Sequence, residues 1–297
     1  MSSPRLRPAG AGIASPRSAG TKSTSFLSPE AGVTPSRPAD LEATLRAARA
    51  SGRKLLVPYV TGGLRDDWVA LLIAVADGGA DAVEVGLPFS DPMMDGPTIQ
   101  EASYRSLERG TTPASVLSEL RGLDVGVPLV VMTYANLVLR AGTKRFASEL
   151  VGAGFSGAIV PDLPLEESEE WERDAATQGL QTVLLAAPVT PDERLSRICE
   201  RSHGFVYGVN LMGVTGERQS LAASSAVLAK RLKATTDKPV VMGFGISGPE
   251  QAVAAAEYAD GVVVASALMR AAMAGAPPEE VGERVAAIRA ALDRGQP

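Results

Sequence analysis

Two kinds of hydrophobic pattern alternate along the chain from Ala39 onward. Short runs rich in β-branched residues predict buried strands, and longer segments whose apolar residues recur every three or four positions predict amphipathic helices. The predicted strands span residues 54–60, 82–86, 128–134, 157–160, 181–187, 204–209, 239–244 and 261–265. The helical pattern lies between them, for example in residues 66–76, 143–151, 165–177, 191–200, 221–234 and 249–257.

This alternation identifies a fold class. Eight strands with seven intervening helical segments, and further helices before the first strand and after the last, predict a (β/α)8 TIM barrel. An open doubly wound sheet usually has fewer strands and a G-x-G-x-x-G turn after its first strand, whereas this turn reads T-G-G-L-R-D. We therefore expect residues 39–297 to form an α/β barrel, the catalytic domain, with an additional N-terminal helix.

Residues 1–38 do not share the pattern, because they consist mainly of Ser, Pro, Gly, Ala and Arg. Such a composition cannot bury enough surface to fold, so we expect a disordered Ser/Pro/Arg-rich N-terminal tail. The segment lacks the apolar stretch of a secretory signal. Its Ser and Arg content also suits an organellar transit peptide, but Pro and Gly interrupt any amphipathic helix, which favours a solvated extension.

Composition and charge exclude several classes of function. The chain is 45% apolar and 21% charged with a net charge of -5, so nothing in its charge predicts a nucleic acid or an anionic membrane as partner. No run approaches the ~20 apolar residues of a membrane span. A single cysteine, Cys199, excludes an intrachain disulfide and a multi-thiolate metal site. We expect a cytoplasmic protein, or a plastid protein if residues 1–38 are a transit peptide.

Reactive side chains are scarce, which narrows the chemistry. The only histidine, His203, falls just before the sixth predicted strand, at the end of a barrel that serves stability. This position argues against a serine triad or a histidine-ligated metal, and we expect no metal. A Schiff base needs a lysine near the C-terminal end of a strand, but the lysines lie in the tail, on helices or at strand beginnings, at Lys22, Lys54, Lys144, Lys230, Lys233 and Lys238.

Glu84 is the first candidate for acid–base chemistry. It lies in the second predicted strand, where the alternate positions Val83, Val85 and Leu87 are bulky and apolar. Because side chains alternate across a strand, the apolar face should meet the helices and Glu84 should point into the barrel near its catalytic end. A carboxyl group half-buried there has a raised pKa, as a general acid or base requires. The alternative, an ion-paired structural glutamate, needs a cation at this rim, where no lysine is available.

Asp95 is the second candidate, in the long segment 87–97 that follows this strand. Two carboxylates in different environments can divide acid and base duties. The alternative is a turn-forming aspartate before Gly96, and Asp91 suits a turn or cap as well. Segments 87–97 and 208–220 are the two long connections in the pattern, and their Gly, Pro, Ser and Thr content is typical of mobile lids.

A phosphate site is predicted near the end of the chain. The segment G-F-G-I-S (243–247) follows the seventh predicted strand, A-S-A (265–267) follows the eighth, and each opens a helix. Helix N-termini bind anions, and these two loops are the usual phosphate cradle of a TIM barrel. The alternative is an ordinary pair of helix caps. The expected donors are backbone N–H groups of Gly216, Gly245, Ile246, Ser247, Ala265 and Ser266.

Five motifs resemble one family, the tryptophan synthase alpha subunits. They are V-G-L-P-F-S-D-P-M-M-D-G-P-T-I-Q (85–100), M-T-Y-A-N-L-V (132–138), P-D-L-P-L-E-E-S (161–168), M-G-V-T-G (212–216) and G-F-G-I-S (243–247). They occur in the family's order, after the predicted strands, and the resemblance extends from about Ala39 to the C-terminus. Residues 1–38 lie outside it.

The resemblance implies a carbon–carbon lyase that cleaves indole-3-glycerol phosphate to indole and glyceraldehyde 3-phosphate in tryptophan biosynthesis. Glu84 falls on the family's catalytic glutamate, and Asp95 on its catalytic aspartate. By this hypothesis Glu84 protonates indole C3 and removes the glycerol hydroxyl proton, while Asp95 interacts with the indole N–H.

The resemblance also implies a set of binding residues. Tyr134, Asp162, Tyr207 and Thr215 fall on family positions that line the site. Tyr59, Met132 and Ile159 are expected to flank the flat apolar indole, although each suits an ordinary core position equally well. Three positions depart from the commonest family pattern, namely Met94, which replaces a small residue, Leu211, which replaces Arg, and Ala265, which replaces Gly.

By the same resemblance, the partner is a separate beta subunit in an α2β2 complex, with loop 87–97 near the interface. Pyridoxal phosphate is expected in the beta subunit and no cofactor in this chain. Three alternatives are a stand-alone lyase that releases free indole, a catalytically silent regulatory partner, and another phosphate-binding barrel enzyme of the same pathway. The two carboxylates argue against the second, and the missing strand-end lysines against the third.

Overall fold

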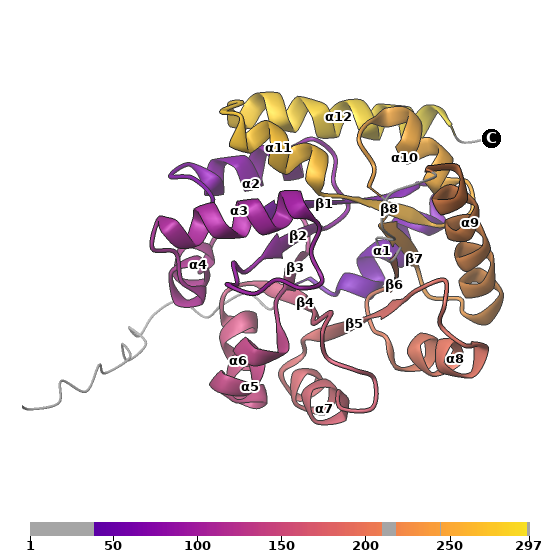
Figure 1. Cartoon of the computed structure of the whole chain (residues 1–297), viewed down its shortest axis with the longest axis horizontal. Coiled ribbons are helices and arrows are strands. Elements are labelled where there is room, and N and C mark those ends of the chain that lie inside the picture. The colour runs from indigo at the N-terminus through magenta and orange to yellow at the C-terminus, as the bar shows by residue number, and fades with distance from the viewer. Residues whose placement is uncertain (1–38, 210–217, 244, 296–297) are drawn as a thin grey trace, which may run out of the picture. The chain divides into compact units, whose positions relative to one another are not determined.

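A computed structural model describes residues 39–209, 218–243 and 245–295. Within these ranges, eight parallel strands close into a barrel in chain order, which confirms the predicted TIM-barrel fold (Figure 1). The predicted tail, residues 1–38, lies outside the described part. The strands are β1 Leu55–Thr61, β2 Val83–Gly86, β3 Leu129–Met132, β4 Phe155–Ile159, β5 Gln181–Ala186, β6 Val206–Val209, β7 Val240–Gly243 and β8 Gly261–Val264.

Helices surround the strands (Figure 1). Two crossovers each hold two helices, because α3 and α4 join β2 to β3, and α5 and α6 join β3 to β4. Thr112 begins α4 with a reciprocal side-chain cap to Ser115, a helix-start signal that the sequence carries. The helices are α1 Leu41–Ala50, α2 Trp68–Asp77, α3 Pro97–Glu108, α4 Pro113–Leu120, α5 Ala135–Ala141, α6 Thr143–Gly152, α7 Glu169–Gln178, α8 Asp192–Arg201, α9 Arg218–Thr235, α10 Pro249–Ala256, α11 Ser266–Met273 and α12 Pro278–Arg294.

The barrel interior is a separate apolar cluster, closed at the N-terminal end of the strands by the predicted extra helix. Leu41 and Leu45 of α1 are both fully buried and pack into this cluster. The side chain of Asp40 accepts a hydrogen bond from the Ala43 backbone and caps the helix. The strand residues of the cluster are Leu55, Val57, Ala82, Val130, Ile159, Val183, Phe205, Val241 and Val263.

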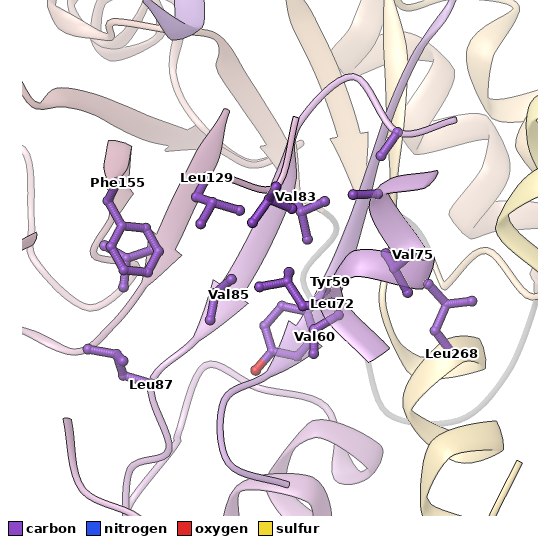
Figure 2. Packing of buried hydrophobic residues seen from close by; sticks show 14 of the residues in the cluster. Tyr59, Val60, Leu72, Val75, Val83, Val85, Leu87, Leu129, Phe155 and Leu268 are labelled. Atoms are coloured by element: carbon purple, nitrogen blue, oxygen red, sulfur yellow. The ribbon is translucent and has the colours of Figure 1, made fainter. Parts of the chain in front are cut away.

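The two faces of β2 are used as the alternation predicts. Val83, Val85 and Leu87 are buried in the cluster between the strands and the outer helices. Figure 2 shows them on the same side of the sheet as Leu129 of the neighbouring β3 and Phe155 of the next strand, β4. Ala82 belongs instead to the interior cluster. Glu84 lies between Tyr59 of β1 and Val130 of β3 in the register of the sheet, so its side chain points inward.

The long connections follow β2, β4 and β6. The loop after β2 ends at Gly96, where Pro97 takes the first position of α3, a position that proline favours. The connection from Val160 to Ser168 has no helix or strand either, so the expectation of only two long connections was wrong. Part of the connection after β6, residues 210–217, lies outside the described ranges. No helix among the described residues is long and apolar enough to cross a membrane.

Candidate active site

Glu84 is almost completely buried, with 1% of its surface exposed. Its Oε2 atom has no hydrogen-bond partner among the described residues. The pKa of Glu84 is raised from 4.5 to about 8, mainly by burial and to a smaller extent by the nearby charge of Asp95. The side chain is therefore largely protonated at neutral pH. A buried polar atom without a partner is costly, and in an active site it is an available proton donor or acceptor.

Asp95 lies at the end of the loop that follows β2, and it is only half-buried. Its Oδ2 atom accepts a hydrogen bond of 2.9 Å from the hydroxyl group of Tyr134. Burial raises the pKa of Asp95 from 3.8 to about 6, although the hydrogen bond from Tyr134 opposes this rise. Asp95 is thus largely ionised at neutral pH while Glu84 is largely neutral. When the pKa values of two carboxyl groups differ, the neutral group can donate a proton and the ionised group can stabilise a positive charge in the same reaction.

The backbone around Asp95 is fixed by a small set of hydrogen bonds. The Asp95 N–H donates to the carbonyl of Pro92 at 3.0 Å. The side-chain amide of Gln100, on α3, donates to the Asp95 carbonyl at 3.0 Å. These bonds make a turn that starts α3 directly after the aspartate, so the helix and the loop position the carboxylate together. Gln100 was not among the predicted site residues, although it is the last residue of the motif 85–100.

Tyr59 adjoins Glu84 in the β1–β2 register and is 3% exposed. Its hydroxyl oxygen accepts a hydrogen bond of 3.3 Å from Thr61. Burial raises the pKa of Tyr59 well above its usual value, and the charge of Asp95 adds to this effect. The phenol is therefore neutral and lies beside Glu84, and its ring also belongs to a cluster of buried core residues.

Tyr207 belongs to β6 and packs beside Phe205 with ring centroids 5.9 Å apart. Burial raises the pKa of its hydroxyl well above the usual value, and both Glu84 and Asp95 contribute to the rise. The hydroxyl therefore lies within electrostatic range of both carboxyl groups. Tyr59, Tyr207, Glu84 and Asp95 form one group at the C-terminal ends of the strands.

Met132 and Ile159 pair across β3 and β4. Met132 is partly exposed and packs against the interior cluster, so it suits a wall of the site. Ile159 is fully buried within that cluster, so it can only lie beneath a bound ligand, at the floor of the site. For Ile159 the structure therefore favours the ordinary core position.

Asp162 is exposed in the connection after β4. Its Oδ1 atom accepts a hydrogen bond of 2.8 Å from the Ala135 backbone at the start of α5. No hydrogen bond within the described ranges joins Asp162 to Glu84 or Asp95. The structure thus places Asp162 beside Tyr134, as an anchor of α5.

Two turns occupy the predicted phosphate site. Gly245 is exposed and has a φ of 54°, a left-handed conformation that favours glycine. Ile246 is 3% exposed and part of the core, whereas Ser247 is exposed. Helix α10 begins at Pro249, as predicted, with Gly248 as its cap. Thr215 and Gly216, also expected in the site, lie outside the described residues.

The second turn of the predicted phosphate site precedes α11. Ser266 is the first residue of this helix, and Ala265 caps it with φ -120° and ψ -73°. Because this φ is negative, the position does not require the glycine that the family commonly has. The first N–H groups of an α-helix have no partner within the helix, so this turn offers donors to an anion.

Other reactive groups lie away from the two carboxyl groups. Lys54 donates to the carbonyls of Ala256 and Ala259 at 2.7 and 2.9 Å, as a structural lysine does. Cys199 is buried, and burial raises its thiol pKa, which makes it a poor nucleophile. Within the described ranges, no three His, Cys, Asp or Glu side chains are grouped to hold a metal ion.

An open cavity of about 480 Å³ lies along the loop that carries Asp95. Neither Glu84 nor Asp95 lines it, although Pro92 and Gln100, which are hydrogen-bonded to the Asp95 backbone, do. Three large apolar side chains of this region are exposed, namely Met93 at 86%, Tyr104 at 57% and Met94 at 48%. The cavity is lined by Phe89, Ser90, Asp91, Pro92, Met93, Pro97, Gln100, Glu101 and Tyr104.

Known proteins that are similar to this chain share one description. The family profile described as tryptophan synthase alpha chain matches residues 45–294. The tryptophan synthase alpha chain of Streptomyces avermitilis is 45% identical over 260 residues, which cover 86% of this chain and 94% of the relative. That of Gloeobacter violaceus is 44% identical and covers 84% of this chain and 91% of its own length.

Solved structures of the same family share the fold. The crystal structure of tryptophan synthase alpha chain from Legionella pneumophila has a TM-score of 0.77 and 34% identity, covering 86% of this chain and 97% of its own. A chain of Mycobacterium tuberculosis tryptophan synthase has a TM-score of 0.78 and 38% identity, covering 85% of this chain and 97% of its own.

Proposed function

The chain belongs to the family of tryptophan synthase alpha chains, and on this premise we propose that Glu84 and Asp95 divide the acid–base work of its lyase reaction. The protein is a lyase of tryptophan biosynthesis. The observation that carries the proposal is the pair of carboxyl groups at the barrel mouth, with pKa values of about 8 and about 6. At neutral pH one is ready to donate a proton and the other is ready to accept a hydrogen bond from a cationic or polarised group.

The proposed substrate is indole-3-glycerol phosphate, and the reaction is a retro-aldol cleavage. Neutral Glu84 donates its proton to C3 of the indole ring, which makes an indolenine cation. The Asp95 carboxylate interacts with the ring N–H and stabilises this positive charge. Glu84, now ionised, removes the proton of the glycerol hydroxyl beside C3. The carbon–carbon bond breaks, its electrons return to the ring, and indole and glyceraldehyde 3-phosphate are released with Glu84 protonated again.

The remaining site residues are assigned to binding. Tyr59, Tyr207 and Met132 form walls for the flat indole, Ile159 forms the floor, and Thr215 belongs to the loop that follows β6. The phosphate binds to N–H groups of the turns before α10 and α11, with Gly216 as a further donor. The left-handed turn at Gly245 and the free N–H groups at the start of α11 support this assignment.

We propose a tryptophan synthase beta subunit as the partner, in an α2β2 complex. The cavity beside the Asp95 loop supports a docking surface there, because Met93, Met94 and Tyr104 expose apolar surface around it. Replacement of Met93 by Asp should weaken beta-subunit binding in sedimentation experiments, whereas Val227→Asp, at an exposed position on α9, should not. Equal weakening by both variants would contradict this surface.

No cofactor is assigned to this chain, and pyridoxal phosphate is assigned to the beta subunit. We also propose a cytoplasmic location, since the relatives above come from bacteria, which have no plastids.

Indole release by purified variants tests the acid–base assignment. Glu84→Gln keeps the shape of the side chain but cannot exchange a proton at this pH, so kcat should fall by roughly 100-fold or more. Glu280→Gln is the control, because it removes an exposed carboxylate paired with Arg284 on α12, and it should have wild-type activity. The assay is run with and without a beta subunit. Wild-type turnover by Glu84→Gln would refute the proposal.

A further inference from the structure

We propose that Tyr134 is a positioning residue for Asp95, whose hydroxyl group orients the carboxylate and docks the loop that carries it. The inference rests on the proposed role of Asp95 and changes the role of Tyr134. The family resemblance assigns Tyr134 to the substrate, whereas its hydrogen bonds in this chain are made to the β2–α3 loop.

The hydrogen bonds fix the direction of the tyrosine proton. The backbone N–H of Met94 donates to the Tyr134 hydroxyl oxygen at 3.2 Å. An amide N–H can only donate, so the hydroxyl is the acceptor there and its single proton is available elsewhere. That proton is donated to Oδ2 of Asp95 at 2.9 Å. One hydroxyl group thus holds two successive residues of the loop, one by its backbone and one by its carboxylate.

Tyr134 is itself held firmly on the barrel. It is 3% exposed and is the cap residue of α5, two residues after the end of β3. The next N–H in the chain, that of Ala135, is bound by Asp162 at 2.8 Å. On its ring side Tyr134 carries Phe89, itself a residue of the docked loop, which stacks with a centroid distance of 4.8 Å and an interplanar angle of 18°. The fixed point is therefore Tyr134, and the loop is docked onto it.

This arrangement has a consequence that a substrate contact would not have. The hydrogen bond from Tyr134 lowers the pKa of Asp95 against the larger effect of burial, because a donor stabilises the ionised form. Without the hydroxyl group, Asp95 should hold its proton to a higher pH and its carboxylate should be less well oriented. Both changes reduce turnover, whereas loss of a substrate contact raises KM.

The test is Tyr134→Phe, which keeps the ring stacked on Phe89 and removes only the hydroxyl group. Indole release by the full chain is measured from pH 5 to pH 9. We expect kcat at neutral pH to fall roughly tenfold to 100-fold, as for loss of a hydrogen bond to a charged group. KM should change little, and the acidic limb of the kcat profile should move above about pH 6. The melting temperature shows whether the variant is folded.

Tyr258→Phe is the matched control. It also removes a tyrosine hydroxyl that is hydrogen-bonded to a carboxylate, that of Glu257, but between α10 and the start of β8. Its kcat, KM and pH profile should equal those of the wild type. A raised KM with unchanged kcat and an unmoved acidic limb in Tyr134→Phe would overturn the proposal, and so would wild-type behaviour.

A double-mutant cycle separates this inference from the proposed function. If Tyr134 acts through Asp95, Tyr134→Phe should cause little further loss in an Asp95→Asn background. Wild-type activity of Asp95→Asn would refute the proposed role of Asp95. A large loss in Asp95→Asn with fully additive loss in the double variant would refute only the positioning role.

Discussion

The phenol oxygen of Tyr59 occupies the space next to Gly86 that any larger residue would need for its side chain. A Cβ atom at Gly86 would overlap this oxygen and would lie 2.8 Å from Cε2 of the same ring. Both residues face the barrel interior, one from β1 and one from β2. Glu84 is the partner of Tyr59 in the β1–β2 register and lies two residues before Gly86 on β2, so the fit of the tyrosine against the glycine shapes the site around the acid.

The first prediction is that Gly86→Ala displaces Tyr59. Overpacking of this kind costs about 1–3 kcal/mol of folding free energy, and the displaced ring should also lower indole release. The measurements are urea unfolding and kcat. A second Tyr59→Ala change should reduce the stability cost of Gly86→Ala, because it removes the overlap. Gly248→Ala is the control for the stability measurement, since its added Cβ meets no atom closer than 3.5 Å; an equal loss of stability in both variants would contradict the steric explanation.

The second prediction concerns activity and pH. Glu84 must start protonated and its pKa is about 8, whereas Asp95 must be ionised and its pKa is about 6. The kcat profile should therefore be bell-shaped, with its maximum between these values. Because the two groups interact, the limbs report apparent pKa values of the pair. Steady-state indole release over pH 5–9 measures the profile, and undiminished turnover at pH 9 would argue against Glu84 as the acid.

Much of this site was predictable because it depends on local alternation. The period-two pattern of Val83, Val85 and Leu87 placed Glu84 in the barrel, and the order of strands and helices identified the closed fold. Those signals arise from burial on one face of a strand. They need no knowledge of which strand lies next to which.

The contacts around the carboxyl groups were not predictable in the same way. The sequence places Tyr134 in a strand because Thr133 and Tyr134 continue the β-branched and aromatic run, but β3 ends at Met132 and Tyr134 caps α5. Whether Asp162 meets substrate or a helix N-terminus depends on the relative positions of two loops. The fit of Tyr59 against Gly86 depends on the register of two strands, which the pattern of one strand does not determine.

The third prediction concerns the two phosphate turns. Gly245 has a φ of 54°, so Gly245→Ala should cost about 1–2 kcal/mol in the left-handed conformation and disturb the N–H donors of the turn. KM should rise, and inhibition by inorganic phosphate should weaken. Ala265 already has a negative φ, so Ala265→Gly should change neither quantity. Tighter phosphate binding by Ala265→Gly would show that the alanine impairs the site.

The fourth prediction concerns stability and pH, and its sign follows from the raised pKa of Glu84. In the unfolded chain this group has a pKa near 4.5, and in the folded protein the pKa is about 8. Between these values the folded protein keeps a proton that the unfolded chain has lost, so raising the pH favours unfolding. Above about pH 8 Glu84 is ionised in both the folded and the unfolded state, so it no longer makes the free energy of unfolding depend on pH.

Urea unfolding at several pH values from 5 to 8.5 measures this effect. The wild type should lose stability relative to Glu84→Gln as the pH rises, by an amount on the order of a few kcal/mol over the whole window. The difference in pH dependence between the two proteins isolates the titration of Glu84, because Asp95 titrates in both. The stability of Glu280→Gln should change with pH in the same way as that of the wild type, since that carboxylate is exposed on α12. If the wild type and Glu84→Gln had the same dependence on pH, Glu84 would have to be ionised in the folded protein, and it could not be the proton donor of the reaction.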